Sequence, residues 1–242
     1  MSRQFAIGYL ALCSRRALRF LPASLLLFLA SQAFAQSYVG RFEVYEGYMY
    51  LDSPHVSLAE PGYHIQAGLR KSTRISLGFD YSRGTGDLSM TSNLLTTALQ
   101  QQFNSAISSG VLPANYRLAV PMRASTQTFT MGPQFPYRRF NKVTPFVRPS
   151  VGALKEVATV RPTDFLTHLI VGTITPTGRL EEWTAFYGFG GGVALNFSRH
   201  FSLVVQADFV HDHLFNDILK DGRNTVRLSI GPGFQFGKNV RK

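Results

Sequence analysis

The feature that most constrains the fold is a strict alternation of side-chain character in residues 224–237 (NTVRLSIGPGFQFG). Apolar side chains occupy every second position from Val226 to Phe236. Small or polar side chains, from Thr225 to Gln235, fill the positions between them. Because successive side chains of a strand point to opposite faces, the segment predicts a β-strand with one apolar and one polar face. Such a strand suits a barrel with a lipid-facing wall and a polar interior.

The composition narrows the fold class further. Charged residues make up 16% of the chain and aromatic residues 13%, with 21 Gly and 20 Phe, a mixture unusual for a soluble enzyme. The body of the chain has no apolar run of about 18 residues or more, so we do not expect a helical membrane protein. The composition therefore favours a β-barrel over both alternatives.

The N-terminus reads as a secretory signal. Four arginines precede an apolar segment at residues 21–30, and residues 33–35 (AFA) form an A-x-A cleavage site. An uncleaved anchor helix is the alternative, but the apolar segment is short for it. We expect a cleaved signal peptide at residues 1–35 and an outer-membrane barrel at residues 36–242.

The exported part of the chain is basic and has no cysteine. Cys13, the only cysteine, lies in the signal, so disulfides and thiol chemistry are not expected. Residues 36–242 hold 21 basic and 14 acidic residues, a net charge of +7. Export argues against nucleic acid as the partner. Anionic outer-membrane lipid headgroups or lipopolysaccharide phosphates are the more natural partners.

Seven further segments alternate like the last one, and together they predict eight strands. They are residues 42–51, 63–70, 75–82, 126–137, 143–153, 183–197 and 201–211. We expect irregular pairing at Pro133 or Pro136. The turns after the second, fourth and sixth segments are short, and the other connections are longer. This asymmetry predicts an all-β, eight-stranded antiparallel up-and-down transmembrane barrel with short periplasmic turns and long external loops.

Two long connections are expected at residues 84–122 and 154–182. Within the first, residues 92–109 carry a helical apolar stripe that ends before Gly110, a helix C-cap position. This helix could fold onto its own rim, close the barrel mouth, rest on the outer leaflet or dock an external partner.

Several segments resemble a known family. They are FEVYEGYMYLD (42–52), FTMGPQFPYRR (129–139), TPFVRPSVGAL (144–154), residues 185–210 and the final strand. In order and spacing they resemble the small outer-membrane β-barrel proteins, OmpA-like in their barrel domain. The resemblance implies location in the bacterial outer membrane and biogenesis through the barrel assembly machinery. It does not extend to the peptidoglycan-binding domain, because five residues follow Gly237.

The alternation places a set of charges inside the barrel. The predicted interior set is Arg70, Asp80, Arg148, Asp208 and Arg227, with Glu43 or Glu46 as a further member. An eight-stranded barrel is just wide enough for side chains, and charges there need partners. The set therefore predicts an ion-pair network that fills the lumen, or alternatively a narrow gated ion path.

The residues that could support catalysis or metal binding are few. His211, Asp212 and His213 lie near the external rim, His200 lies in a turn, and His64 could reach the interior near the rim. No nucleophile motif accompanies them, and three consecutive residues of a strand do not face one way. We therefore predict no catalytic residue, no metal site and no cofactor.

These patterns predict an outer-membrane protein with a structural or surface-interaction role. The external loops would carry recognition of an external partner. The alternatives are a narrow gated pore and a lipid-modifying outer-membrane enzyme.

Overall fold

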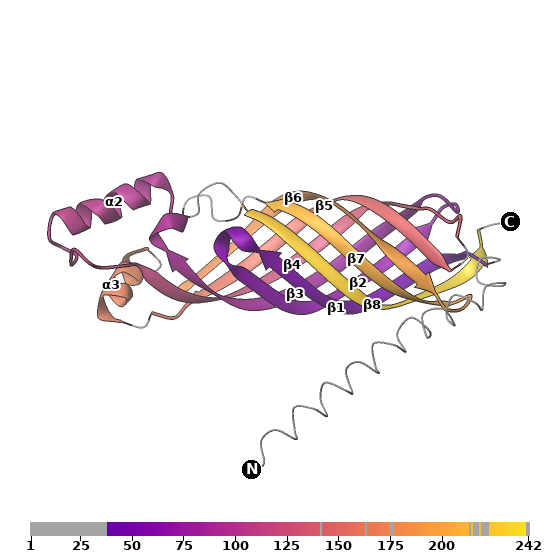
Figure 1. Cartoon of the computed structure of the whole chain (residues 1–242), viewed down its shortest axis with the longest axis horizontal. Coiled ribbons are helices and arrows are strands. Elements are labelled where there is room, and N and C mark those ends of the chain that lie inside the picture. The colour runs from indigo at the N-terminus through magenta and orange to yellow at the C-terminus, as the bar shows by residue number, and fades with distance from the viewer. Residues whose placement is uncertain are drawn as a thin grey trace, which may run out of the picture.

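The computed structural model describes residues 38–240 apart from 141, 163, 175–176, 213, 215–217 and 219–222. The predicted signal peptide, its cleavage site and Cys13 lie outside this range. Eight strands form a closed barrel in which each strand pairs with its sequence neighbour and β1 pairs with β8 (Figure 1). The predicted fold class is confirmed.

The strands are long and all antiparallel. They are β1 (Gly40–Ser53), β2 (Leu58–Arg70), β3 (Ser76–Thr91), β4 (Ala119–Pro136), β5 (Val143–Val160), β6 (Arg179–Asn196), β7 (Phe201–Asp212) and β8 (Arg223–Asn239). As predicted, the last strand closes the barrel against the first, with Phe42 opposite Phe236 and Leu51 opposite Arg227. The pairing of β4 with β5 is interrupted between Met131 and Phe135, around Pro133, without a change of register.

The wall has an apolar belt bounded by two aromatic girdles. The exposed belt side chains include Val44, Ile65, Leu77, Phe79, Met131, Val147, Val151, Phe189, Val205 and Ile230. At one edge the rings of Tyr63, Tyr81, Phe129 and Trp183 follow one another at centroid distances of 6.0, 5.0 and 6.1 Å. At the other edge Phe201, Phe234, Phe236 and Phe42 form a similar series at 5.0, 5.8 and 5.5 Å.

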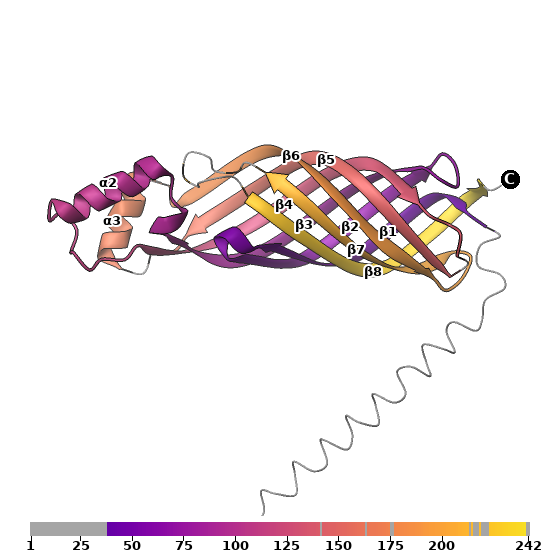
Figure 2. The ribbon, with the colours of Figure 1, turned by 45° about the horizontal axis from the view of Figure 1, so that its top comes forward.

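Long and short connections lie at opposite ends of the barrel. Residues 71–75, 137–142 and 197–200 join strands at the short-turn end. The long-loop end carries α2 (Thr97–Ser108) and α3 (Phe165–Ile174), which project beyond the strands in Figure 1 and Figure 2. Among the described residues no helix has the length and apolar character needed to cross a membrane.

Three sequence-based boundaries are wrong at the long-loop end. The expected connections 84–122 and 154–182 shrink to residues 92–118 and 161–178, because β3, β4, β5 and β6 all extend further. The first connection is also short, with only η1 (Pro54–Val56) and Ser57 between β1 and β2. Above the belt the outward residues are polar, so the hydrophobic alternation stops although the strand pairing continues.

The predicted helix is confirmed in its position. Residues 92–109 contain η2 (Ser92–Leu94) and α2, followed by Gly110 with a φ of +78°. Leu95 is buried, and Leu99 and Phe103 pack against the apolar core at this end of the barrel. The apolar stripe therefore folds onto its own rim.

Candidate functional site

Four charged side chains meet at the centre of the lumen, and we call them the central network. Arg227 donates from Nε and Nη2 to Asp208 Oδ2 at 3.0 and 2.7 Å and from Nη1 to Asp80 Oδ1 at 3.3 Å. Arg148 donates to the other oxygen of Asp80. The two arginines and two aspartates balance in charge, and each is at most 6% exposed.

Neutral side chains complete the central network. Arg227 Nη1 also donates to Ser82 Oγ at 3.2 Å and Thr128 Oγ1 at 3.3 Å. Gln206 donates to Asp208 at 2.7 Å, and Arg148 donates to Gln66 at 3.1 Å. The strands supply these groups from around the barrel, since β2, β3, β4, β5, β7 and β8 all contribute inward residues. This arrangement fills the lumen at mid-height with hydrogen-bonded side chains.

Glycine in β6 makes room for this network. A Cβ added at Gly190 would lie 1.9 Å from Asp208 Oδ1, and one added at Gly192 would lie 2.8 Å from a ring carbon of Phe146. The glycine run of the sixth strand therefore permits close approach of bulky interior groups, as its sequence indicates.

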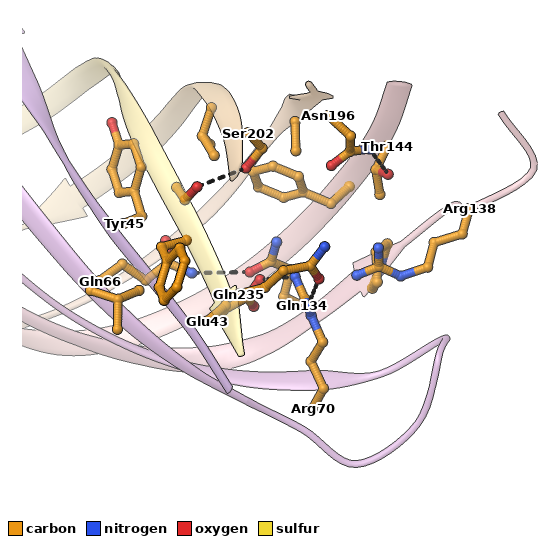
Figure 3. Close-up of a pocket in the computed structure, with 17 residues that line it drawn as sticks. Glu43, Tyr45, Gln66, Arg70, Gln134, Arg138, Thr144, Asn196, Ser202 and Gln235 are labelled. Atoms are coloured by element: carbon orange, nitrogen blue, oxygen red, sulfur yellow. Dashed lines mark hydrogen bonds and ion pairs between the residues drawn. The ribbon is translucent and has the colours of Figure 1, made fainter. Parts of the chain in front are cut away.

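The fifth predicted member, Arg70, does not join the central network. It lies near the short-turn end, where it pairs with Glu43 and donates to Gly40 O at 3.1 Å (Figure 3). Glu43, Arg70, Gln134 and Gln235 line a small vestibule in which water can enter about 40 Å³. That volume holds one or two water molecules rather than a continuous water column.

Glu46 is not an interior residue, and this alternative of the sequence prediction is wrong. It lies on the outer wall with Val44 and Tyr48, and its strand partner in β2 is Ile65. Among the described strand residues between the two girdles, it is the only charged side chain on the belt. Strand parity decides its direction, because Tyr45 and Met49 of the same strand are buried in the lumen.

A second ion cluster, absent from the sequence prediction, lies inside the barrel above the belt. Arg223 forms an ion pair with Glu156 at 2.5 Å and donates a hydrogen bond from Nε to Asp212 Oδ2 at 3.2 Å. Glu60 accepts hydrogen bonds from Thr126 N and Oγ1 at 3.0 and 2.6 Å. We call Glu60, Glu156, Asp212 and Arg223 the upper cluster; all four are at most 4% exposed.

The upper cluster has more acids than bases. Burial, followed by repulsion from Glu156, raises the pKa of Glu60 to about 7. Burial also raises the pKa of Glu156, and the nearby carboxylates of Glu156 and Asp212 raise the pKa of Arg223 against the effect of burial. The residues flanking Thr126 on the outer wall, Ser125 and Gln127, are polar, so the cluster lies beyond the belt.

Apolar side chains fill the lumen around and above the upper cluster. Nine buried residues, which we call the apolar plug, pack together there: Leu95, Leu118, Val120, Met122, Leu154, Ala158, Phe186, Val210 and Leu214. Ile170 and Val171 of α3 and Leu99 of α2 pack against the apolar plug from outside. The long-loop end of the lumen is therefore closed by a hydrophobic core.

The groups considered for catalysis are dispersed or inaccessible. His64 lies at mid-lumen rather than near the rim, with Nδ1 3.1 Å from Ser229 Oγ and Nε2 3.6 Å from Asp80 Oδ1. The vestibule and two small apolar cavities at the long-loop end are lined by other residues. Asp212 points inward, whereas His211 contacts Asn224 at 2.7 Å near the surface. His213 lies outside the described residues, and the described residues contain no metal-binding group of three acids or histidines.

The closed barrel has an apolar outer belt, two aromatic girdles and a polar interior. A polypeptide barrel of eight antiparallel strands with these surfaces is built for lipid outside and hydrogen bonds inside. The chain is an outer-membrane β-barrel. In such barrels the short turns face the periplasm and the longer loops face outward, so α2 and α3 lie at the external end.

Comparisons with known proteins give similar solved structures but no sequence match. No protein-family model and no curated protein sequence matches the chain. Among solved structures it is similar to Neisserial surface protein A, with 10% identity, a TM-score of 0.49 and coverage of 81% of this chain and 96% of that one. It is also similar to OprG from Pseudomonas aeruginosa, with 9% identity, a TM-score of 0.47 and coverage of 85% of this chain and 100% of that one. For Ail from Yersinia pestis the identity is 12% and the TM-score 0.45, with coverage of 81% of this chain and 96% of that one.

Proposed function

We propose that this barrel is a closed membrane scaffold that presents its external loops for surface interaction. Two observations carry the proposal: the lumen is filled at two levels, and apolar side chains are exposed on α3 and just after α2. The central network and the apolar plug fill the lumen with side chains at different heights, which supports a closed barrel rather than an open pore.

The external end offers apolar surface that the barrel itself does not use. Phe165 and Leu169 of α3 are 76% and 56% exposed, and Val111 after α2 is 74% exposed. The neighbouring Ile170 and Val171 pack on the apolar plug, so α3 is anchored by one side and exposes the other. Tyr116 ties the α2 connection to α3 through a hydrogen bond to Thr167 at 2.9 Å. Exposed apolar side chains on a tethered helix favour contact with another surface.

Surface interaction is testable with fluorescent nanodiscs that each hold one barrel. Flow cytometry would measure their binding to intact bacterial and host cells. We expect the double variant F165S/L169S to lose most of the binding. The matched control Q101S/Q102S changes two exposed polar residues of α2 and should bind like the wild type. Equal binding by both variants, with barrels intact by heat-modifiable migration, would remove the loop role.

Neither alternative function has a supporting observation of its own. We propose that the protein is not an enzyme, because the Ser229–His64–Asp80 contact is buried where no lipid can reach it. Lipid A from cells with and without the protein should give identical mass spectra; a new modification dependent on His64 would contradict the proposal.

A further inference from the structure

The positive charge of the exported chain is concentrated in the three short turns and the C-terminal residues. These segments, residues 71–74, 137–142, 197–200 and 237–242, contain nine Lys or Arg and no acidic residue. Without those nine, residues 36–242 would hold 12 basic and 14 acidic residues. The whole excess of +7 therefore comes from these segments, and the three turns place most of it at the periplasmic end of the barrel.

Four cations of the short turns are exposed to solvent. Lys71, Arg74, Arg139 and Arg199 are exposed, and no acidic side chain of the described residues forms an ion pair with them. The acid nearest to this end in the sequence, Glu43, points into the lumen and is paired with Arg70. Exposed like charges gathered at one end of a barrel attract anions from the surroundings.

A groove at the short-turn end focuses this charge. It lies between the turn after β2 and the turn after β4, beside the terminal residues Val39 and Val240, and has a volume of about 610 Å³. Its lining includes Arg74, Arg138 and Arg139 together with Ser72, Thr73, Tyr137 and the inward-facing Pro136. Arg138 Nε donates to Thr73 O at 3.2 Å and so joins the two turns. Ser72 Oγ accepts from the backbone N–H groups of Arg74 and Ile75 at 3.2 Å each, which shapes the first turn.

The apolar side of the groove identifies the kind of anion. Phe135 and Tyr137 line it, and Ile75 is exposed beside it, at the edge of the belt. The turns are too short to carry the arginines away from the membrane surface. A ligand seated here would place an anionic group on guanidinium groups and a hydrocarbon chain along the belt, which is the form of a phospholipid rather than of a soluble glycan.

We propose that this groove binds the headgroup of an anionic phospholipid of the inner leaflet, with the surrounding turn cations as a wider attracting ring. The anionic lipid that the positive net charge predicts as a partner would therefore lie in the periplasmic leaflet. It would not be the lipopolysaccharide of the outer leaflet. The site is independent of the surface role proposed for the external helices, since the two lie at opposite ends of the barrel (Figure 1).

The single tryptophan of the chain makes a direct test possible. Trp183 belongs to the external girdle, so the variant F140W/W183F moves the fluorophore to the short-turn end, next to the groove but outside its lining. The barrel is placed in phosphatidylcholine nanodiscs containing a minor fraction of brominated phosphatidylglycerol or brominated phosphatidylcholine. Bromine quenches only nearby tryptophan, and both leaflets have the same composition, so the direction of insertion does not matter.

We expect brominated phosphatidylglycerol to quench the F140W/W183F reporter at least about fivefold more effectively per lipid than brominated phosphatidylcholine, since one surface cation changes lipid affinity by about that factor. Adding R74Q/R139Q should remove most of the preference, and salt at about 0.5 M should weaken it by screening, whose length is then about 4 Å. The matched control R83Q/R123Q removes two exposed cations at the external end and should leave the preference unchanged.

Equal quenching by the two lipids would overturn the proposal. A preference that survives R74Q/R139Q would place the site elsewhere and overturn the assignment to this groove. Displacement of the lipid by soluble peptidoglycan fragments would instead assign the cations to cell-wall carboxylates. Heat-modifiable migration of every variant separates these outcomes from a folding defect.

Discussion

Replacing Arg227 by methionine should unbalance the central network and destabilise the barrel strongly. Arg227 makes five hydrogen bonds, to Asp208, Asp80, Ser82 and Thr128. Without it two buried aspartates face one arginine. Removing one partner of a buried ion pair typically costs about 3–5 kcal/mol, and we expect R227M to fall in that range.

The double variant D208N/R227M should recover much of this loss. It leaves Arg148 with Asp80, a neutral pair, so its cost should be about 2 kcal/mol or less. The coupling between the two substitutions should therefore exceed about 2 kcal/mol. R70M is the matched control: it removes another interior arginine and should cost less than R227M, because its partner Glu43 lines the vestibule at the short-turn end, where water can reach it.

The assay is reversible urea unfolding in lipid, followed by Trp183 emission and by heat-modifiable migration. The network hypothesis fails if R227M costs no more than R70M. It also fails if the double variant costs the sum of its two single variants, because that sum would mean that the charges do not depend on one another.

Three further substitutions test other parts of the barrel. E46L should raise the unfolding free energy in bilayers by about 1–2 kcal/mol, since it removes a carboxylate from the lipid-facing belt; destabilisation would instead reveal a partner for Glu46. The raised pKa of Glu60, about 7 against the usual 4.5, means that the folded state holds a proton that the unfolded state releases, so stability should fall by up to about 3 kcal/mol between pH 4.5 and 7. In urea titrations at several pH values, E60Q should weaken this dependence of the unfolding free energy on pH. An unchanged pH dependence would mean that Glu156, rather than Glu60, binds the proton. G190A should destabilise by driving a methyl group into Asp208, whereas neutral unfolding data would mean that the carboxylate can move aside.

The parts of the fold that sequence predicts best are those in contact with lipid. Within the belt, each strand must alternate between hydrocarbon and the lumen, so Val226 to Phe236 and the corresponding rows reveal both the strand and its faces. Arg227 contacts two acids of the predicted interior set, Asp80 and Asp208. The inward direction of all three residues follows from the same parity.

The upper cluster could not be read in the same way. Above the belt both faces of a strand tolerate polar residues, so Glu156 and Asp212 look like loop residues although they point inward from β5 and β7. The even spacing of Leu154, Glu156 and Ala158 is a signal that β5 continues, but it is too short to separate from a loop. Strand parity shows which face a side chain lies on but not its height along the barrel axis. This explains why parity alone groups Arg70 with the central network.

Single-channel recording in planar bilayers tests the closed scaffold most directly. Because the central network and the apolar plug fill the lumen at separate heights, the wild-type barrel should insert without producing discrete current steps over hours at either polarity. A stable open current from the purified wild-type protein, altered by substitution of Arg148 or Asp208, would contradict the closed lumen and establish a pore.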